Sequence, residues 1–206
     1  MNCTRFLTVT SLLTAISVLP SLALGADLGS VAGTIKVSGV KSPENVLVFL
    51  EEVPGEWKPT KGAEVDQAKL TFVPHVLPVV VGTTVAFRNS DPILHNIFWP
   101  KGKGYAGKNL GTWGKGAKRE YKFDRLGEVV LLCNVHPEME GHVIVLQNPF
   151  FAVVGKDGNY EIKNVPPGKY TAKTWYPKPR KLRSKSAEVT VEAGKAAELD
   201  FSLSRR

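Results

Sequence analysis

The apolar residues of this chain fall in short runs separated by glycine, proline and other turn residues, and this pattern constrains the fold more than any other feature. Residues 31–37 alternate apolar with small or polar side chains, as in a half-buried strand, and residues 46–50 form a continuous run typical of a core strand. Residues 156–159, Lys-Asp-Gly-Asn, are a strong hairpin turn. Patterns with the helical period are scarce. We therefore expect an all-β chain built as sandwiches or barrels.

The same pattern places the remaining strands and the connections between them. Further strands are expected at residues 70–73, 76–81, 85–87, 121–123, 129–132, 142–146, 152–154, 160–162, 170–175, 188–192 and 197–203. Residues 54–68 are predicted to be a connection, and residues 100–118, rich in glycine and lysine, an exposed loop. The rhythm of strands and turns changes near Phe150, which indicates a second structural unit beyond that point.

Residues 1–26 have the features of a secretory signal. Arg5 precedes an apolar and hydroxyl-rich run at 6–19, and small residues follow, with acceptable cleavage points after Gly25 or Ala26. The alternative is an uncleaved membrane anchor, but the run is diluted by threonine and serine, and a bilayer span needs about 20 apolar residues. We expect an exported protein, periplasmic or secreted, with no transmembrane segment after cleavage.

Removal of this signal would leave one cysteine, Cys133, and one methionine, Met139. An unpaired cysteine in an exported protein needs an explanation, because that compartment oxidises thiols. One explanation is a buried and inert thiol. The residues around Cys133 favour another.

Residues 133–139, Cys-Asn-Val-His-Pro-Glu-Met, place a thiolate, an imidazole and a thioether within one loop between two expected strands. Two soft sulfur donors with imidazole suit copper, and one cysteine with two histidines and a weak axial methionine is the ligand set of electron-transfer copper sites. The loop supplies Cys133, His136 and Met139. His95, which follows an earlier strand, is placed to supply the second imidazole.

Other ligands and another metal are the alternatives to this set. Glu138, Glu140 and His142 are alternative ligands, although a carboxylate in a loop is more often solvated. His75 stands in a strand pattern without a partner motif and is expected to be a surface or structural histidine. Zinc also binds cysteine and histidine, but a closed zinc site normally uses stronger ligands than a thioether.

Residues 67–146 resemble the cupredoxins, the blue-copper proteins. Residues 82–89, Gly-Thr-Thr-Val-Ala-Phe-Arg-Asn, are similar to the family strand before the first ligand, and His95-Asn96 is similar to the family pair of ligand and neighbouring asparagine. The compact Cys-x-x-His-x-x-Met spacing and Pro137 resemble amicyanin more than the longer plastocyanin loop. The family usually has serine or threonine at the position of Asn134. The resemblance therefore predicts the ligand set but not the reduction potential of this chain.

The resemblance implies a Greek-key β-barrel or sandwich holding one copper ion, Cu(I) or Cu(II), and an electron carrier rather than an enzyme. It implies that Asn96 and Asn134 support the ligands and that His136, with Pro137, is the electron port. Phe98 and Trp99 are candidates for an apolar patch around it, or are core residues. The resemblance also implies a redox partner protein, such as a cytochrome or a dehydrogenase. A copper carrier or chaperone is the alternative, since its ligands would be similar.

Residues 152–203 resemble the carboxypeptidase regulatory-like sandwich, which is transthyretin-like and immunoglobulin-like, through the hairpin turn and the Val-Pro-Pro-Gly-Lys-Tyr segment at 165–170. Two strands that normally precede this hairpin match residues 33–37 and 46–50, so the cupredoxin segment is predicted to be inserted into the second sandwich. The predicted organisation is a signal at 1–26, the first sandwich strands at 27–56, the cupredoxin domain at 64–147 and the rest of the sandwich at 149–206. The whole chain resembles exported proteins labelled methylamine-utilisation proteins.

The chain is basic, with a formal net charge of +8. No nucleic-acid motif accompanies that charge, so acidic proteins or a membrane surface are the expected partners and nucleic acid is not. Two basic runs stand out: Lys101, Lys103, Lys108, Lys115, Lys118 and Arg119, and then Lys178, Arg180, Lys181, Arg183 and Lys185. Such runs are commonly solvated loops; the alternative is that the first run steers an acidic redox partner to the copper site.

Overall fold

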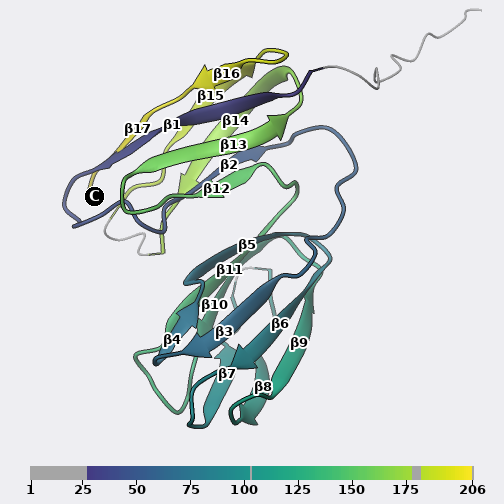
Figure 1. Cartoon of the computed structure of the whole chain (residues 1–206), viewed down its shortest axis with the longest axis vertical. Coiled ribbons are helices and arrows are strands. Elements are labelled where there is room, and N and C mark those ends of the chain that lie inside the picture. Colours follow the sequence, from purple (N-terminus) through teal and green to yellow (C-terminus); the bar gives the residue numbers. More distant parts are fainter. Residues whose placement is uncertain (1–26, 103, 178–181, 206) are drawn as a thin grey trace, which may run out of the picture.

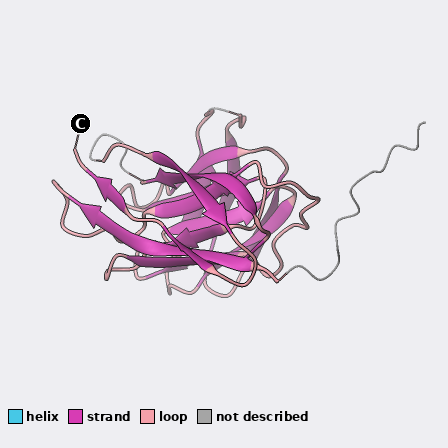
Figure 2. Cartoon of the chain, turned by 90° about the horizontal axis from the view of Figure 1, so that it is seen from above, coloured by secondary structure: helices cyan, strands magenta, loops and turns pink. Residues whose placement is uncertain are grey.

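The computed structural model describes residues 27–102, 104–177 and 182–205, and every regular element in these ranges is a β-strand (Figures 1 and 2). No helix that could cross a membrane occurs in this part of the chain. The predicted signal, residues 1–26, lies outside the described residues, as do Lys103 and residues 178–181 of the basic runs. The prediction of an all-β fold is confirmed.

The strands form two sandwiches, which we call the terminal and the central sandwich (Figure 1). The terminal sandwich pairs β13-β1-β16, with β17 also on β1, and places them over a sheet of order β12-β2-β14-β15. Its strands are β1 (Gly29–Val37), β2 (Leu47–Glu51), β12 (Phe151–Val153), β13 (Asn159–Val165), β14 (Gly168–Trp175), β15 (Ser186–Val191), β16 (Ala196–Glu198) and β17 (Phe201–Leu203).

Alternation along β1 explains how the terminal sandwich closes. Val31 and Ile35 are buried, while the residues between them are partly exposed, so one face of the strand lies on the core. These side chains join a cluster that includes Val48 from β2, Ile162 from β13 and Leu203 from β17. Full burial of each such side chain stabilises the fold by about 1.5–3 kcal/mol.

The central sandwich is formed by residues 64–146 and has its own core. One sheet has the order β5-β11-β10-β7-β8 and the other β4-β3-β6-β9. The strands are β3 (Glu64–Ala68), β4 (Thr71–Val73), β5 (Val76–Val80), β6 (Thr83–Asn89), β7 (His95–Trp99), β8 (Lys108–Trp113), β9 (Lys118–Phe123), β10 (Gly127–Leu132) and β11 (Glu140–Leu146). The core is aromatic: Trp99, Tyr121 and Phe123 pack together with ring centroids 4.9–5.8 Å apart.

Several strands differ from the sequence-based expectation: no strand was predicted at β7, and the single strand predicted at 197–203 is divided into β16 and β17. The predicted connection at 54–68 contains β3, and the predicted loop at 100–118 contains β8 and the start of β9. In β3 a buried glutamine, Gln67, occupies an inward position and donates to the Arg88 carbonyl, so the strand carries little apolar signal. β8 is an edge strand that pairs only with β7 and is mostly exposed, so its residues need not alternate.

The chain leaves the terminal sandwich after β2 and returns to it at β12. β1 pairs with β13, β16 and β17, and β2 pairs with β12 and β14. The two sandwiches meet at a small apolar cluster of Leu47, Val76 and Ile144, with Trp175 packed against it. The exact domain limits and the transthyretin-like assignment of the terminal sandwich stay predictions.

Candidate metal centre

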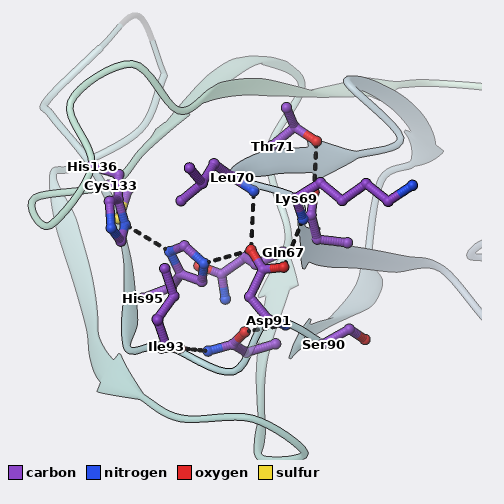
Figure 3. Close-up of polar contacts among 12 residues, drawn as sticks. Gln67, Lys69, Leu70, Thr71, Ser90, Asp91, Ile93, His95, Cys133 and His136 are labelled. Carbon is purple, nitrogen blue, oxygen red and sulfur yellow. Dashed lines mark hydrogen bonds and ion pairs between the residues drawn. The ribbon is translucent and has the colours of Figure 1, made fainter.

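Three of the four predicted ligands lie together at one end of the central sandwich (Figure 3). His95 begins β7, Cys133 directly follows β10, and His136 lies in the loop after it. β7 and β10 are neighbours in one sheet, so the start of one strand lies beside the end of the other. The ligand atoms of the three residues all lie within 4.8 Å of one another. His95 and Cys133 are buried and His136 is half-buried.

The two imidazoles face each other through their Nδ1 atoms, which are 3.0 Å apart. On its other side, His95 Nε2 lies 2.9 Å from Oδ2 of Asp91. A carboxylate accepts a hydrogen bond, so Nε2 carries the proton and the lone pair of Nδ1 faces His136 and Cys133. A carboxylate that orients a histidine in this way is the usual second contact of a metal-binding imidazole.

Asp91 is itself fixed by the turn between β3 and β4 (Figure 3). Its oxygens accept the backbone N–H groups of Lys69 at 2.7 Å and Leu70 at 3.0 Å. The Leu70 N–H, with that of Lys69 and the His95 ring, lowers the pKa of the Asp91 carboxyl, although burial opposes the shift. Asp91 is therefore ionised at neutral pH. The role of Asp91 was missed in the sequence, where its only signal is its position four residues before His95.

The backbone of this turn adopts an unfavourable conformation in order to make the contact with Asp91. Ala68 pairs with Thr71, so Lys69 and Leu70 are the two residues of a tight hairpin. Their φ angles are 55° and 59°, which places two residues other than glycine in the left-handed region. Such residues cost on the order of 1–3 kcal/mol each, and they persist where surrounding contacts require them. Here both N–H groups point at one carboxylate.

Asn96 connects Cys133 to the neighbouring strands. Its backbone N–H approaches Cys133 Sγ at 3.4 Å, and its Oδ1 accepts the backbone N–H of Asn134 at 3.3 Å. Its Nδ2 donates to Asn109 Oδ1 and to the Gly111 carbonyl. The contact made by Asn134 uses its backbone N–H, so that contact does not depend on which side chain stands there.

Met139, the fourth predicted ligand, is only 1% exposed and lies in the same apolar cluster as Cys133. Its backbone N–H donates to the His136 carbonyl at 3.0 Å, which closes the loop around Pro137. The structure therefore places the methionine side chain in the core of the central sandwich, three residues after the half-buried His136. Its role as an axial ligand stays a prediction.

The other candidate residues lie elsewhere. Glu138 is exposed, and Glu140 and His142 group with His75 rather than with His95. Trp99 is 2% exposed and packs in the core, which decides between the two alternatives for this residue in favour of the core; Phe98 is half-buried. Large apolar side chains are exposed at Ile93, Leu94 and Val135, within two residues of His95 or His136 in the sequence. Leu70, in the β3–β4 turn, is also exposed.

The donor set fits copper. A thiolate and two imidazole nitrogens are soft and borderline donors, and calcium or magnesium would require oxygen ligands. The close approach of two Nδ1 atoms beside a buried sulfur is the arrangement expected of groups that converge on one soft cation. A β-sandwich with this cluster at one end defines the class as a cupredoxin fold.

Comparison with known proteins agrees with that class. Residues 60–146 match the family described as copper binding proteins, plastocyanin/azurin family, and the cofactor is copper. No curated protein sequence matches the chain. An amicyanin variant in its reduced state is 31% identical over 45% of this chain and 95% of its own, with a TM-score of 0.39.

Two further solved structures are similar over part of the chain. A purple cupredoxin from Nitrosopumilus maritimus is 26% identical over 40% of this chain and 98% of its own, with a TM-score of 0.36. The copper-containing nitrite reductase of Thermus scotoductus SA-01 is 29% identical over 40% of this chain, with a TM-score of 0.39, and this chain spans only 22% of that enzyme.

Proposed function

We propose that this protein is a type 1, or blue, copper electron carrier of the periplasm or the extracellular space. His95, Cys133 and His136 would hold the copper, with Met139 as the weak axial ligand. The observation that carries the proposal is the convergence of three ligand atoms within 4.8 Å, with the tautomer of His95 fixed by Asp91. When bound, copper supplies a one-electron redox change.

The protein would contribute to electron transfer by holding the copper ligands in fixed positions. His95 is held on one side by the Asp91 carboxylate. Cys133 follows β10, an inner strand of its sheet, and its sulfur accepts the Asn96 N–H. That N–H stabilises negative charge on sulfur and thereby influences the reduction potential. Ligands fixed by ladders and hydrogen bonds move little between the two oxidation states, so the reorganisation energy is small.

Electrons would enter and leave through the exposed side of the loop. His136 is half-buried and Pro137 is exposed, whereas the other ligands are buried. Exposed Leu94 and Val135, which directly precede His95 and His136, give this side an apolar character suited to brief docking of a redox protein.

The described members of the first basic run support an acidic partner, such as a cytochrome or a dehydrogenase. Lys118 is exposed while paired with Glu120, whereas Lys101 and Lys108 are exposed at the Trp99 end of β7, away from His95. The Arg119 guanidinium lies 5.5 Å from the ring centroid of Trp113, the residue that pairs with His95 across the ladder. Positive charge on Arg119 near the port, together with the net positive charge of the chain, would raise the rate of encounter with an acidic protein.

Copper loading and redox cycling test the proposal. The mature protein given Cu(II) should turn blue through thiolate-to-copper charge transfer, and copper should stay bound through repeated reduction and reoxidation. A colourless, zinc-binding protein would contradict the electron-carrier assignment. Ready loss of Cu(I) to a modest competitor would instead favour a copper carrier or chaperone, which must release its metal.

A further inference from the structure

A second cluster of metal-binding side chains lies where the two sandwiches meet. We infer that His75, Glu140 and His142 form a site for a borderline divalent cation of the Zn²⁺ or Cu²⁺ type. One ligand atom from each lies within 4.8 Å of the others. This inference does not rest on the proposed function, because the cluster shares no residue with the blue-copper candidate.

The backbone brings the three residues together from two parallel strands. β5 pairs with β11, with Val76 opposite His142, and the His142 N–H donates to the His75 carbonyl at 2.9 Å. Glu140 and His142 are two residues apart on β11, so their side chains lie on one face. That face continues through Ile144 into the apolar cluster between the sandwiches.

The orientation of His142 matches that of a metal ligand. Its Nδ1 lies 3.1 Å from Oε1 of Glu128, and the other oxygen of Glu128 accepts the indole N–H of Trp175 at 3.4 Å. Since a carboxylate accepts hydrogen bonds, Nδ1 carries the proton and the lone pair is on Nε2. A carboxylate behind the imidazole is the arrangement that orients metal-binding histidines, and Trp175, from the terminal sandwich, holds that carboxylate.

His142 Nε2 is the unexplained atom of the cluster. His142 is 2% exposed, and its Nε2 is buried without a hydrogen-bond partner among the described residues. It lies 3.4 Å from Oε1 of Glu140, but not in the geometry of a hydrogen bond. A lone pair beside a carboxylate is unfavourable in a poorly solvated place unless a cation lies between them. A bound metal ion supplies that cation; a second proton on the ring is the competing explanation.

The cluster can be reached from solvent. A pocket of about 310 Å³ is lined by His75 and Glu140 together with Leu70, Thr71 and Pro137. Two imidazoles and one carboxylate with open positions are a ligand set known for zinc and other borderline metals. Without a thiolate, this set differs from the soft donor set at Cys133, so the two sites would prefer different ions.

Zinc binding to the mature chain carrying Cys133→Ala tests the inference, because that substitution removes the thiolate of the first centre. With zinc chloride as the probe and a chromophoric chelator as competitor, we expect one equivalent to bind. Glu128→Gln, one contact away from the metal, should weaken binding by about 10- to 100-fold. Glu140→Gln and His75→Ala, which remove proposed ligands, should weaken it at least as much.

Glu138→Gln is the matched control, since Glu138 lines the same pocket two residues from Glu140 and is outside the cluster. It should leave zinc affinity unchanged. Near-ultraviolet circular dichroism checks that each variant is folded, and copper-loaded wild-type protein offers a second arm that should take up one zinc without a change in its blue absorption. Absence of the zinc equivalent in both arms, or equal affinities for the Glu138 and Glu140 variants, would overturn the inference and leave His142 as a protonated ion-pair residue.

Discussion

The two sandwiches are built by the same rules, but they bury different kinds of side chain. The buried core of the terminal sandwich is almost wholly apolar; among its described strands, the polar exception is Thr174, whose hydroxyl bonds to the backbone of Lys185. The central sandwich buries a much larger polar set: Gln67, Thr83, Asn89, His95, Asn96 and His142. Burying a polar group costs free energy unless its bonds are satisfied, so the central core depends on internal hydrogen bonds such as those that Gln67 and Asn89 donate to backbone carbonyls.

The strongest test of this contrast removes one buried group from each sandwich. Cys133→Ala should abolish the blue absorption completely, because the charge-transfer band requires the thiolate. Thr174→Val, a substitution of similar size at a buried position of the terminal sandwich, should leave the spectrum unchanged. Absorption spectra of the copper-loaded variants measure both effects, and a blue Cys133→Ala protein would refute the ligand set.

A second test removes apolar packing instead of chemistry. Ile162→Ala in the terminal core should lower the free energy of unfolding by about 2–5 kcal/mol, because the side chain is 1% exposed and leaves a cavity. The blue band should keep its position. Leu131→Ala, equally buried on the strand that ends before Cys133, should cost a similar amount and also alter the band. Denaturant unfolding with spectra before unfolding gives both readings; a shifted band in the Ile162 variant would show that the two cores are not independent.

The smallest of these effects concerns the carboxylate behind His95. Asp91→Asn should lower copper affinity by about 10- to 100-fold, since it weakens the contact that fixes the imidazole. The control is Asp157→Asn, in which an aspartate that also accepts a turn N–H is changed in the terminal sandwich. Copper affinity measured by chelator competition should be unchanged in that control. Equal affinities for the Asp91 variant and wild type would show that the ladder alone orients His95.

The features predicted correctly from the sequence are those in which all the residues that determine the feature are close together in the chain. The loop at 133–139 carries its donors within a few residues. A turn forms at Gly155–Gly158 as expected, but the predicted hairpin was wrong, because β12 pairs with β2 and β13 pairs with β1 in the opposite sheet. Most strands were found because alternating burial leaves an alternating pattern. The edge strand β8 was missed because little of it is buried.

The missed features of the site depend on pairing between distant segments. Asp91 acts through the β3–β4 turn, and no local pattern shows that the N–H groups of Lys69 and Leu70 reach it. His75 and His142 meet because β5 and β11 lie side by side in parallel, although a long stretch of chain separates them. Parallel pairing joins segments that are distant in the sequence, and the local sequence of neither strand identifies its partner.

The path of the chain through β1 has a consequence for the order of folding during synthesis. β1 is among the first strands made, yet it lies between β13 and the last strands, β16 and β17, and the Thr34 N–H bonds to Asp200, 166 residues later. Nascent chains emerge from the N-terminus, and contacts between distant segments form slowly. The central sandwich, by contrast, is one continuous segment. It can therefore fold, and bring His95, Cys133 and His136 together, before the partners of β1 and β2 have been made.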